Sequence, residues 1–189
     1  MASQTKNYFR ALYDAATVIN SSLNPQIVLQ KIVEQVAAAL STKGCALRLI
    51  DRSGKYLLAG ASYGLSKEYL RKGQVEMLKS RIDADVLGSG KVVHMKDVIT
   101  DPRFQYPEAA RTEGIASVLV APLLVDKKPV GVLRVYTEKP REFSVDEHDF
   151  LMAVAHIAAI AIENARLHEA LRSDYELLTH QFNNQIFED

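Results

Sequence analysis

Cysteine and histidine, the side chains that most often carry nucleophilic or metal chemistry, are thinly spread along this chain. The single cysteine, Cys45, has no histidine near it in the sequence, so a cysteine–histidine pair is not indicated. His148 and His156 stand eight residues apart, which is not the i, i+4 spacing of a zinc pair on a helix. We therefore predict no catalytic residue and no metal site. The histidines are His94, His148, His156, His168 and His180.

A short glycine motif at residues 87–91, LGSGK, has a superficial likeness to a phosphate-binding loop. In a loop of the form G-x-x-x-x-G-K the first glycine would stand at position 85, which is Asp85 here. We therefore interpret this motif as a turn that ends a helix.

An arginine inside an apolar strand is the strongest indication of binding chemistry. Residues 45–51 read as a strand in which Ala46, Arg48 and Ile50 share one face. The other face, which begins at Cys45, is more apolar and should meet helices, so Arg48 should point to the opposite side of the sheet. Burying an unpaired guanidinium costs several kcal/mol. Arg48 therefore needs either an anionic ligand or a carboxylate of the protein.

The sequence leaves both kinds of partner open, since buried charges are usually paired within the protein. The carboxylates that offer this second explanation are Asp97, Asp101 and Glu108 in the expected loops, and Glu34 and Glu163 in the expected helices.

Further candidates follow from the same alternation along later strands. Val132, Arg134 and Tyr136 share one face, and so do Ser117, Leu119 and Ala121. Aromatic and basic side chains between the strands, Tyr106 among them, are candidates to line a lid, although plain packing explains each of them too. The candidate ligand-binding residues are Arg48, Tyr63, Asp97, Phe104, Arg111, Ser117 and Arg134.

Composition bounds the class of protein. The 189 residues suit one domain with helical extensions, and 23 basic against 23 acidic residues give no field that favours nucleic acid or an anionic membrane. The longest apolar run, residues 150–162, is interrupted by His156 and is shorter than the roughly 20 residues that span a bilayer. The N-terminus lacks an apolar signal core, and one cysteine suits a reducing compartment. We expect a cytoplasmic protein without nucleic-acid or membrane partners.

Hydrophobic periodicity divides the chain into helices and short strands. Strands at 115–125 and 130–136, joined by a polar turn at 126–129, form a central hairpin that must be covered on both faces. A second hairpin is expected at 45–51 and 56–63, and a brief strand at 92–95. Helices are expected at 8–19, from Pro25 to before Gly44, at 66–72, from a cap at Asp83 to about Gly88, at 107–113, and from Ser144 onward. This pattern is α+β.

These segments, in this order and spacing, resemble the GAF domain, a small-molecule sensing module related in architecture to PAS domains. The likeness covers roughly residues 23–171 and is carried by the strings CALRLID, ASYGLS, GKVVHMKDVITDPRF, EGIASVLVAPL, PVGVLRVYT, EFSVDEHDFL and AIAIENARLHEAL. It implies a mostly antiparallel sheet of about six strands. The N- and C-terminal helices would lie on one face, and short helices and loops would close a ligand pocket on the other. Residues 1–22 would be an N-terminal amphipathic helix, and residues 172–189 a helical extension and tail.

The resemblance implies a regulatory, non-enzymatic domain of a signal-transduction system, with its ligand or cofactor unknown and a separate output protein such as a kinase or regulator. Family members that hold a bilin attach it through a cysteine in the small-helix region, whereas Cys45 stands in the first strand. Free methionine sulfoxide reductases of this fold use several cysteines, and this chain has one. Family members that bind cyclic nucleotides carry an Asn-Lys-Phe-Asp-Glu signature. Only its Phe, Asp and Glu have counterparts in this chain, which are Phe143, Asp146 and Glu147. The alternative is a dimerising structural or protein-interaction module without a ligand.

The terminal helices carry a pattern typical of a homodimer. After Ser144, apolar residues follow alternating steps of three and four, with Asn164 at an a-like position and Asp174 as an interruption. The seam consists of Ile157, Ile160, Asn164, Leu167, Leu171 and Leu178. The neighbouring face, with Val154, Ala158, Ala161 and Ala165, suits packing on the sheet. The first helix presents Phe9, Leu12, Ala16 and Ile19, which we expect in the same four-helix bundle.

Overall fold

A computed structural model describes residues 2–21 and 24–186, with side-chain environments for 8–17, 24–172 and 175–176. In these ranges the helices are α1 (Ala2–Ser21), α2 (Pro25–Ala39), α3 (Lys67–Leu70), α4 (Arg81–Ser89), α5 (Pro107–Glu113) and α6 (Val145–Ile186). The strands are β1 (Gly44–Ile50), β2 (Tyr56–Tyr63), β3 (Val75–Glu76), β4 (Val93–Met95), β5 (Ser117–Val125) and β6 (Lys128–Thr137).

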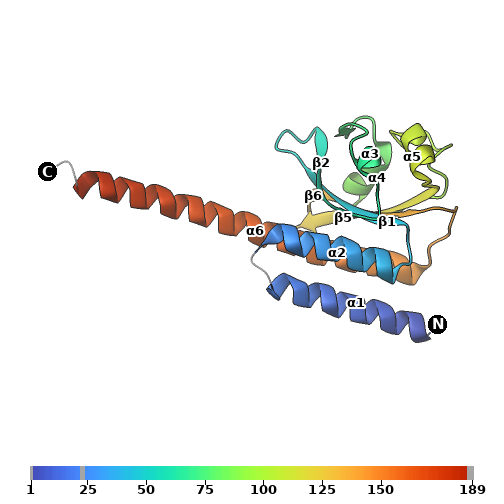
Figure 1. Cartoon of the computed structure of the whole chain (residues 1–189), viewed down its shortest axis with the longest axis horizontal. Coiled ribbons are helices and arrows are strands. Elements are labelled where there is room, and N and C mark those ends of the chain that lie inside the picture. Colours follow the sequence, from blue (N-terminus) through green and yellow to red (C-terminus); the bar gives the residue numbers. More distant parts are fainter. Residues whose placement is uncertain (1, 22–23, 187–189) are drawn as a thin grey trace.

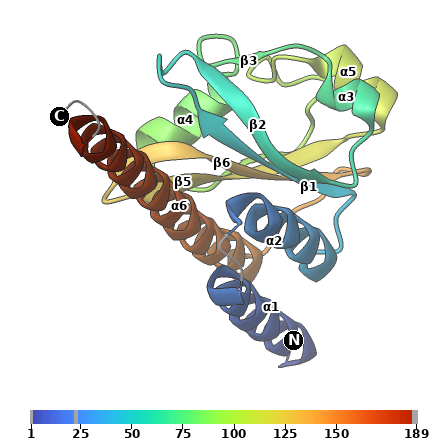
Figure 2. The ribbon, with the colours of Figure 1, turned by 60° about the vertical axis from the view of Figure 1, so that its left-hand side comes forward.

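One six-stranded sheet in the order β3-β2-β1-β6-β5-β4 forms the middle layer. Its paired strands are antiparallel throughout. Helices α1, α2 and α6 lie on one side of the sheet, and α3, α4 and α5 on the other (Figure 1). The view in Figure 2 shows the same three layers, with α6 running diagonally under the sheet. The α+β class and this arrangement of layers confirm the prediction from the sequence.

Each face of the sheet has its own apolar core. On the helix side, Leu47, Leu119 and Leu133 pack with residues of α2 and α6. On the other side, Ala46 and Val132 pack with Tyr69, Ile82 and other residues of α3, α4 and α5. The expected alternation in β1 is confirmed, since Cys45 and Leu47 face the long helices and Ala46 faces the short ones. We call α3, α4, α5 and the loops of residues 64–114 the lid; β3 and β4, which lie in the same range, belong to the sheet.

Local signals account for several boundaries. The Asn24 side chain accepts a hydrogen bond from Gln26 N, and Pro25 occupies the first turn of α2. Before α6, Ser144 N donates to Glu147 and Glu147 N donates to Ser144 Oγ, which is the expected capping box. Gly114 ends α5 with φ of 73°.

Three local predictions were wrong. The central hairpin turns through Asp126 and Lys127 alone, both with positive φ, and Val125 already pairs with Lys128. Two consecutive left-handed residues match the twist of the flanking strands, so no four-residue turn is needed. The Asp101–Pro102 pair in the sequence predicts a helix cap and first turn, but no helix starts there, because the Asp101 carboxylate binds Arg103 in a turn. Asp83 is not the cap of α4: that place belongs to Ser80, and Asp83 turns inward.

The first part of helix α6 packs in the core, and the rest of the helix extends beyond the sheet. Its 28-residue part Val145–Arg172 is, within the described ranges, the one stretch long and apolar enough by composition to cross a membrane, longer than the apolar run expected from the sequence. Leu151, Ala155 and Ala158 are fully buried against the sheet and α2, as in the core helix of a folded domain. Beyond the sheet α6 continues as a single projecting helix (Figure 1).

Candidate functional site

Two arginines lie side by side on the lid-facing side of the sheet. Arg48 comes from β1 and Arg134 from the neighbouring strand β6, where Ala46 pairs with Arg134 and Arg48 pairs with Val132. Arg48 is 5% exposed and Arg134 is 2% exposed. The pleat of two adjacent strands thus places two guanidinium groups diagonally under the lid.

Arg134 has a carboxylate partner. Its Nε donates to Asp83 Oδ1 at 3.0 Å, and its Nη2 donates to Asp83 Oδ2. Ser80 Oγ donates to the same Oδ2 at 2.6 Å. Asp83 is fully buried in the first turn of α4. This bidentate ion pair joins the lid to the centre of the sheet.

Arg48 has no such partner. Its Nη1 donates to the carbonyl oxygen of Leu57 at 3.3 Å, and its Nε is buried without a hydrogen-bond partner in the described part of the chain. The carboxylates considered from the sequence form no ion pair with it among the described residues. Burial lowers the pKa of Arg48, the nearby Tyr136 opposes this, and the charge of Arg134 lowers it further. The protein therefore holds a buried guanidinium that forms no ion pair among the described residues.

Two tyrosines complete the surroundings of Arg48. The rings of Tyr69 from α3 and Tyr136 from β6 meet edge to face, with centroids 6.0 Å apart. Both side chains are buried, and neither hydroxyl has a hydrogen-bond partner within the described residues. Burial, followed by the neighbouring Tyr136, raises the pKa of Tyr69. The Tyr69 hydroxyl is therefore protonated at neutral pH and can donate a hydrogen bond.

A third cation lies at the edge of this group. Lys72 Nζ stands 3.6 Å from the centroid of the Tyr69 ring and donates to the Tyr69 carbonyl oxygen at 3.0 Å. Burial, then the charges of Arg48 and Arg134, lower the pKa of Lys72 to about 7, while Glu113 opposes the shift. We call Arg48, Lys72 and Arg134, with Tyr69 and Tyr136, the cationic cluster. Its donors are those that recognise a carboxylate or phosphate.

The structure brings together three of the seven candidates from the sequence. Arg48 and Arg134 lie in the cationic cluster, and Phe104 is buried in the core beside it. The Asp97 carboxylate binds within its own loop. It accepts a hydrogen bond from Ile99 N at 2.9 Å, and this bond lowers the pKa of Asp97.

The remaining candidates lie elsewhere. Arg111 is exposed on α5 and pairs with Glu108 at 3.2 Å. Tyr63 is exposed at the end of β2, in register with Cys45, which faces the long helices. Ser117 is hydrogen-bonded to Thr137 on the side of the sheet that carries Leu119 and Ala121. Alternation along β5 thus turns Ser117 away from the lid.

Sequence reasoning missed four members of the site: Tyr69, Lys72, Ser80 and Asp83. Tyr69 lies in α3 and Lys72 lies just after it, three residues along, inside the helix that the sequence predicts at 66–72, where this spacing would place them on one face. That spacing was the available signal, but only the packing of α3 on the sheet shows that the face turns toward Arg48.

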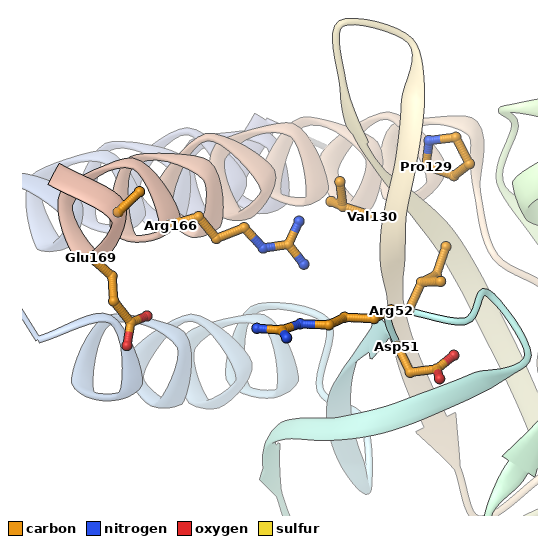
Figure 3. A pocket seen from close by; sticks show the side chains of 8 residues that line it. Asp51, Arg52, Pro129, Val130, Arg166 and Glu169 are labelled. Carbon is orange, nitrogen blue, oxygen red and sulfur yellow. The ribbon is translucent and has the colours of Figure 1, made fainter. Parts of the chain in front are cut away.

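Two hollows open on the surface. One, of about 560 Å³, lies between α3 and α5 and reaches Tyr69 of the cationic cluster; Lys43, Ser66, Glu68, Ala109, Thr112 and Glu113 complete its lining. The other, of about 720 Å³, lies between α6 and the turns of the sheet, where Arg52 and Arg166 reach into it (Figure 3). Its lining carries charges of both signs and includes neither of the lid-facing arginines, so we place the candidate site at the cationic cluster.

Comparison with known proteins fits this geometry. Residues 24–162 match the family model of the GAF domain. The chain is 29% identical over 153 residues to a methyl sulfide methyltransferase-associated sensor of Methanosarcina acetivorans, covering 76% of this chain and 15% of that protein. It is 23% identical to a Nif-specific regulatory protein of Herbaspirillum seropedicae, covering 88% and 31%. The GAF domain of an Acinetobacter phosphoenolpyruvate-protein phosphotransferase superposes with TM-score 0.72 at 26% identity, covering 84% and 94%. The chain therefore spans less than a third of the curated relatives that it matches.

Proposed function

The chain belongs to the GAF domain family, and we propose that it senses a small anionic molecule bound at the cationic cluster and passes the occupancy of that site through a helical dimer interface. GAF domains are sensory and regulatory modules, and the relatives described above are a sensor and a regulator.

The observation that supports an anionic ligand is the state of Arg48. A buried charge without a partner is costly, because its desolvation is not offset by attraction to an opposite charge. The protein nonetheless keeps Arg48 5% exposed, between two buried tyrosine hydroxyls that lack partners among the described residues. A bound carboxylate or phosphate would supply the missing charge and accept from all three side chains.

Access to the site requires the lid to move. The hollow between α3 and α5 already reaches Tyr69. Its two walls are joined by Glu113, whose carboxylate accepts from Ser66 N at 2.9 Å and also from Ser66 Oγ. A ligand that favours one arrangement of these short helices would shift the lid toward it.

Exposed apolar residues on the long helices support the dimer. Leu167 is 55% exposed and Leu171 is 70% exposed, on the same stripe of α6 as Ile160. The adjoining small residues Val154 and Ala158 are buried on the sheet. A second chain covering the stripe would remove this apolar area from water. Leu178 and Asp174 lie outside the residues whose side chains are described.

Helix α1 leaves less of its apolar surface free for a dimer interface than the sequence indicated. Tyr8 is buried and stacks on Phe150 of α6, with ring centroids 4.9 Å apart. Leu12 is partly buried against the same core, while Phe9 is exposed. Part of the apolar face of α1 is thus used within the subunit, and the side of Phe9 stays available to a second copy. Ile19 lies outside the described side chains.

A non-enzymatic role in the cytoplasm, with output through a kinase or regulator, is part of the same proposal. Cys45 is fully buried, and burial raises the pKa of its thiol, so it is a poor nucleophile. The relatives are much longer than the matched region, which is consistent with an output function carried by other segments or proteins.

The alternative is a dimerising module without a physiological ligand, because the exposed stripe on α6 would serve such a module equally well. A thermal-shift screen of nucleotides, amino acids and organic acids, followed by native mass spectrometry, distinguishes the two. A ligand that binds only the folded state at 100 times its dissociation constant adds about 2.7 kcal/mol of stability. Arg48→Gln should abolish the shift and the exposed control Arg111→Gln should retain it. If no compound gives a saturable shift, the alternative stands.

A further inference from the structure

Two of the three cations in the cationic cluster form no ion pair among the described residues. Both oxygens of Asp83 are occupied by Arg134 and Ser80. Glu113 acts on Lys72 through its charge, but its two oxygens accept hydrogen bonds from Ser66 and it forms no ion pair with Lys72. Arg48 and Lys72 are therefore left without an ion pair among the described residues, while Arg134 is balanced by Asp83.

The two cations without an ion pair, Arg48 and Lys72, come from different layers and both lie beside the tyrosine pair. Arg48 rises from β1 on the floor of the site, and Lys72 comes from the residues just after α3 in the lid. Lys72 lies over the ring of Tyr69, and the ring of Tyr69 meets Tyr136 edge to face. A ligand between floor and lid would thus have one cation and one tyrosine hydroxyl on each side.

We infer that the site takes a small oxyanion with two negative charges, and that Lys72 is the residue that sets this preference over a single charge. The inference rests on the function proposed above and adds the ligand class. Dicarboxylates and phosphate or sulfate groups share this chemistry, since each presents several acceptor oxygens and two charges.

Proton uptake is a measurable consequence. The groups that face Lys72 are Arg48 from β1, Arg134 from β6, Glu113 from α5, and the rings of Tyr69 and Tyr106, the latter with its centroid 5.8 Å away. Burial and the two arginines hold the pKa of Lys72 at about 7 in the empty site. A dianion beside it favours the charged amine, so binding should draw a proton onto Lys72 when the pH is above 7.

Isothermal titration with sulfate, succinate and nitrate tests the inference. Sulfate stays a dianion from pH 6.5 to 8.5, so any change in its affinity across that range belongs to the protein. We expect sulfate or succinate to bind at least tenfold more tightly than nitrate at pH 6.5, and about tenfold more weakly at pH 8.5 than at pH 6.5. The sulfate and succinate arms distinguish a tetrahedral ligand from a dicarboxylate.

Three variants assign the effect to one residue. Lys72→Gln should reduce the preference for the dianion over nitrate at least fivefold, and Lys72→Arg should keep the preference and lose the pH dependence. Lys67→Gln, an exposed change on α3, the short helix that precedes Lys72, should alter neither.

The outcomes distinguish the proposed anion site from the inferred preference of that site for a dianion. If Arg48→Gln abolishes anion binding but Lys72→Gln leaves charge preference and pH dependence unchanged, the role of Lys72 is wrong and the anion site stands. If nitrate binds wild-type protein as tightly as sulfate and succinate, or if neither dianion binds at pH 6.5, the dianion inference fails. The anion site itself fails only if the ligand screen is also blank.

Discussion

Asp83 on α4 and Arg134 on β6, 51 residues apart in the sequence, form a fully buried bidentate ion pair, with 3.0 Å between Arg134 Nε and Asp83 Oδ1. Loss of either partner should be strongly destabilising, because the remaining charge would be buried and unpaired. The pair also fixes one short helix of the lid over the sheet. It therefore links the stability of the domain to the geometry of the site.

Removing one member of this pair should destabilise the protein strongly. We expect Asp83→Ala to lower the free energy of unfolding by about 3 to 5 kcal/mol, since it leaves Arg134 charged and unpaired. Urea denaturation followed by circular dichroism measures this. The matched control is Glu108→Ala, which breaks the exposed pair with Arg111 and should cost less than about 1 kcal/mol. Equal effects of the two changes would contradict a structural role for the buried pair.

Arg48 should behave in the opposite way to Arg134, although both are buried arginines on adjacent strands. Arg48→Met removes a charge that no carboxylate among the described residues offsets and keeps a side chain of similar length, so stability should change by less than about 1 kcal/mol or rise. Arg134→Met should cost about 3 to 5 kcal/mol, because it leaves Asp83 alone. Parallel urea titrations compare the two. A loss at Arg48 as large as at Arg134 would assign Arg48 to structure.

The pH dependence of stability should reveal the lowered pKa of Lys72. Its pKa in the folded protein is about 7, well below the ordinary value near 10.4. Between these values the unfolded chain binds more protons than the folded chain at this residue, so stability rises with pH. The free energy of unfolding of wild type minus that of Lys72→Met should therefore increase from pH 7 to pH 9 and stay flat below pH 6. A constant difference over pH 7 to 9 would mean that Lys72 titrates normally.

The fold is more predictable from the sequence than the site, for a physical reason. Strand alternation is a local property, so the residue pattern alone predicts that Arg48 lies on the face opposite Leu47, which packs against the long helices. The partner of a buried charge is not local. An aspartate three residues after Ser80 looks like an ordinary helix-start residue, and only the approach of α4 to β6 turns Asp83 into the partner of Arg134.

The same limit applies to the lid. Tyr63 and Arg111 have the residue types of a binding site, but the ends of β2 and α5 leave them in water. Tyr69 looks like an ordinary helical aromatic residue, and the docking of α3 buries its hydroxyl beside Arg48. The binding role of all seven candidates stays a prediction, and the variants above test it for Arg48.

The last prediction concerns the exposed stripe on α6. Ile160, Leu167 and Leu171 are each more than half exposed, and they follow steps of seven and four along the helix. In a parallel pair of α6 helices these residues would face each other, with Asn164 between them. A buried asparagine lowers the stability of such a seam but, paired with its symmetry mate, fixes the register and favours two strands. We therefore expect a homodimer at tens of micromolar.

Leu167→Asp tests this arrangement, because it places two carboxylates opposite each other in the seam and touches nothing in the described core of the subunit. Sedimentation equilibrium should show a monomer for Leu167→Asp and a dimer for wild type. Arg166→Asp introduces the same charge on another face of α6, and it should remain dimeric. Circular dichroism and thermal unfolding at low concentration check that the sheet is intact in both variants. A wild-type monomer at tens of micromolar, or a dimer that survives Leu167→Asp, would rule out α6 as the interface, and occupancy of the cationic cluster would then have to reach its output by another route.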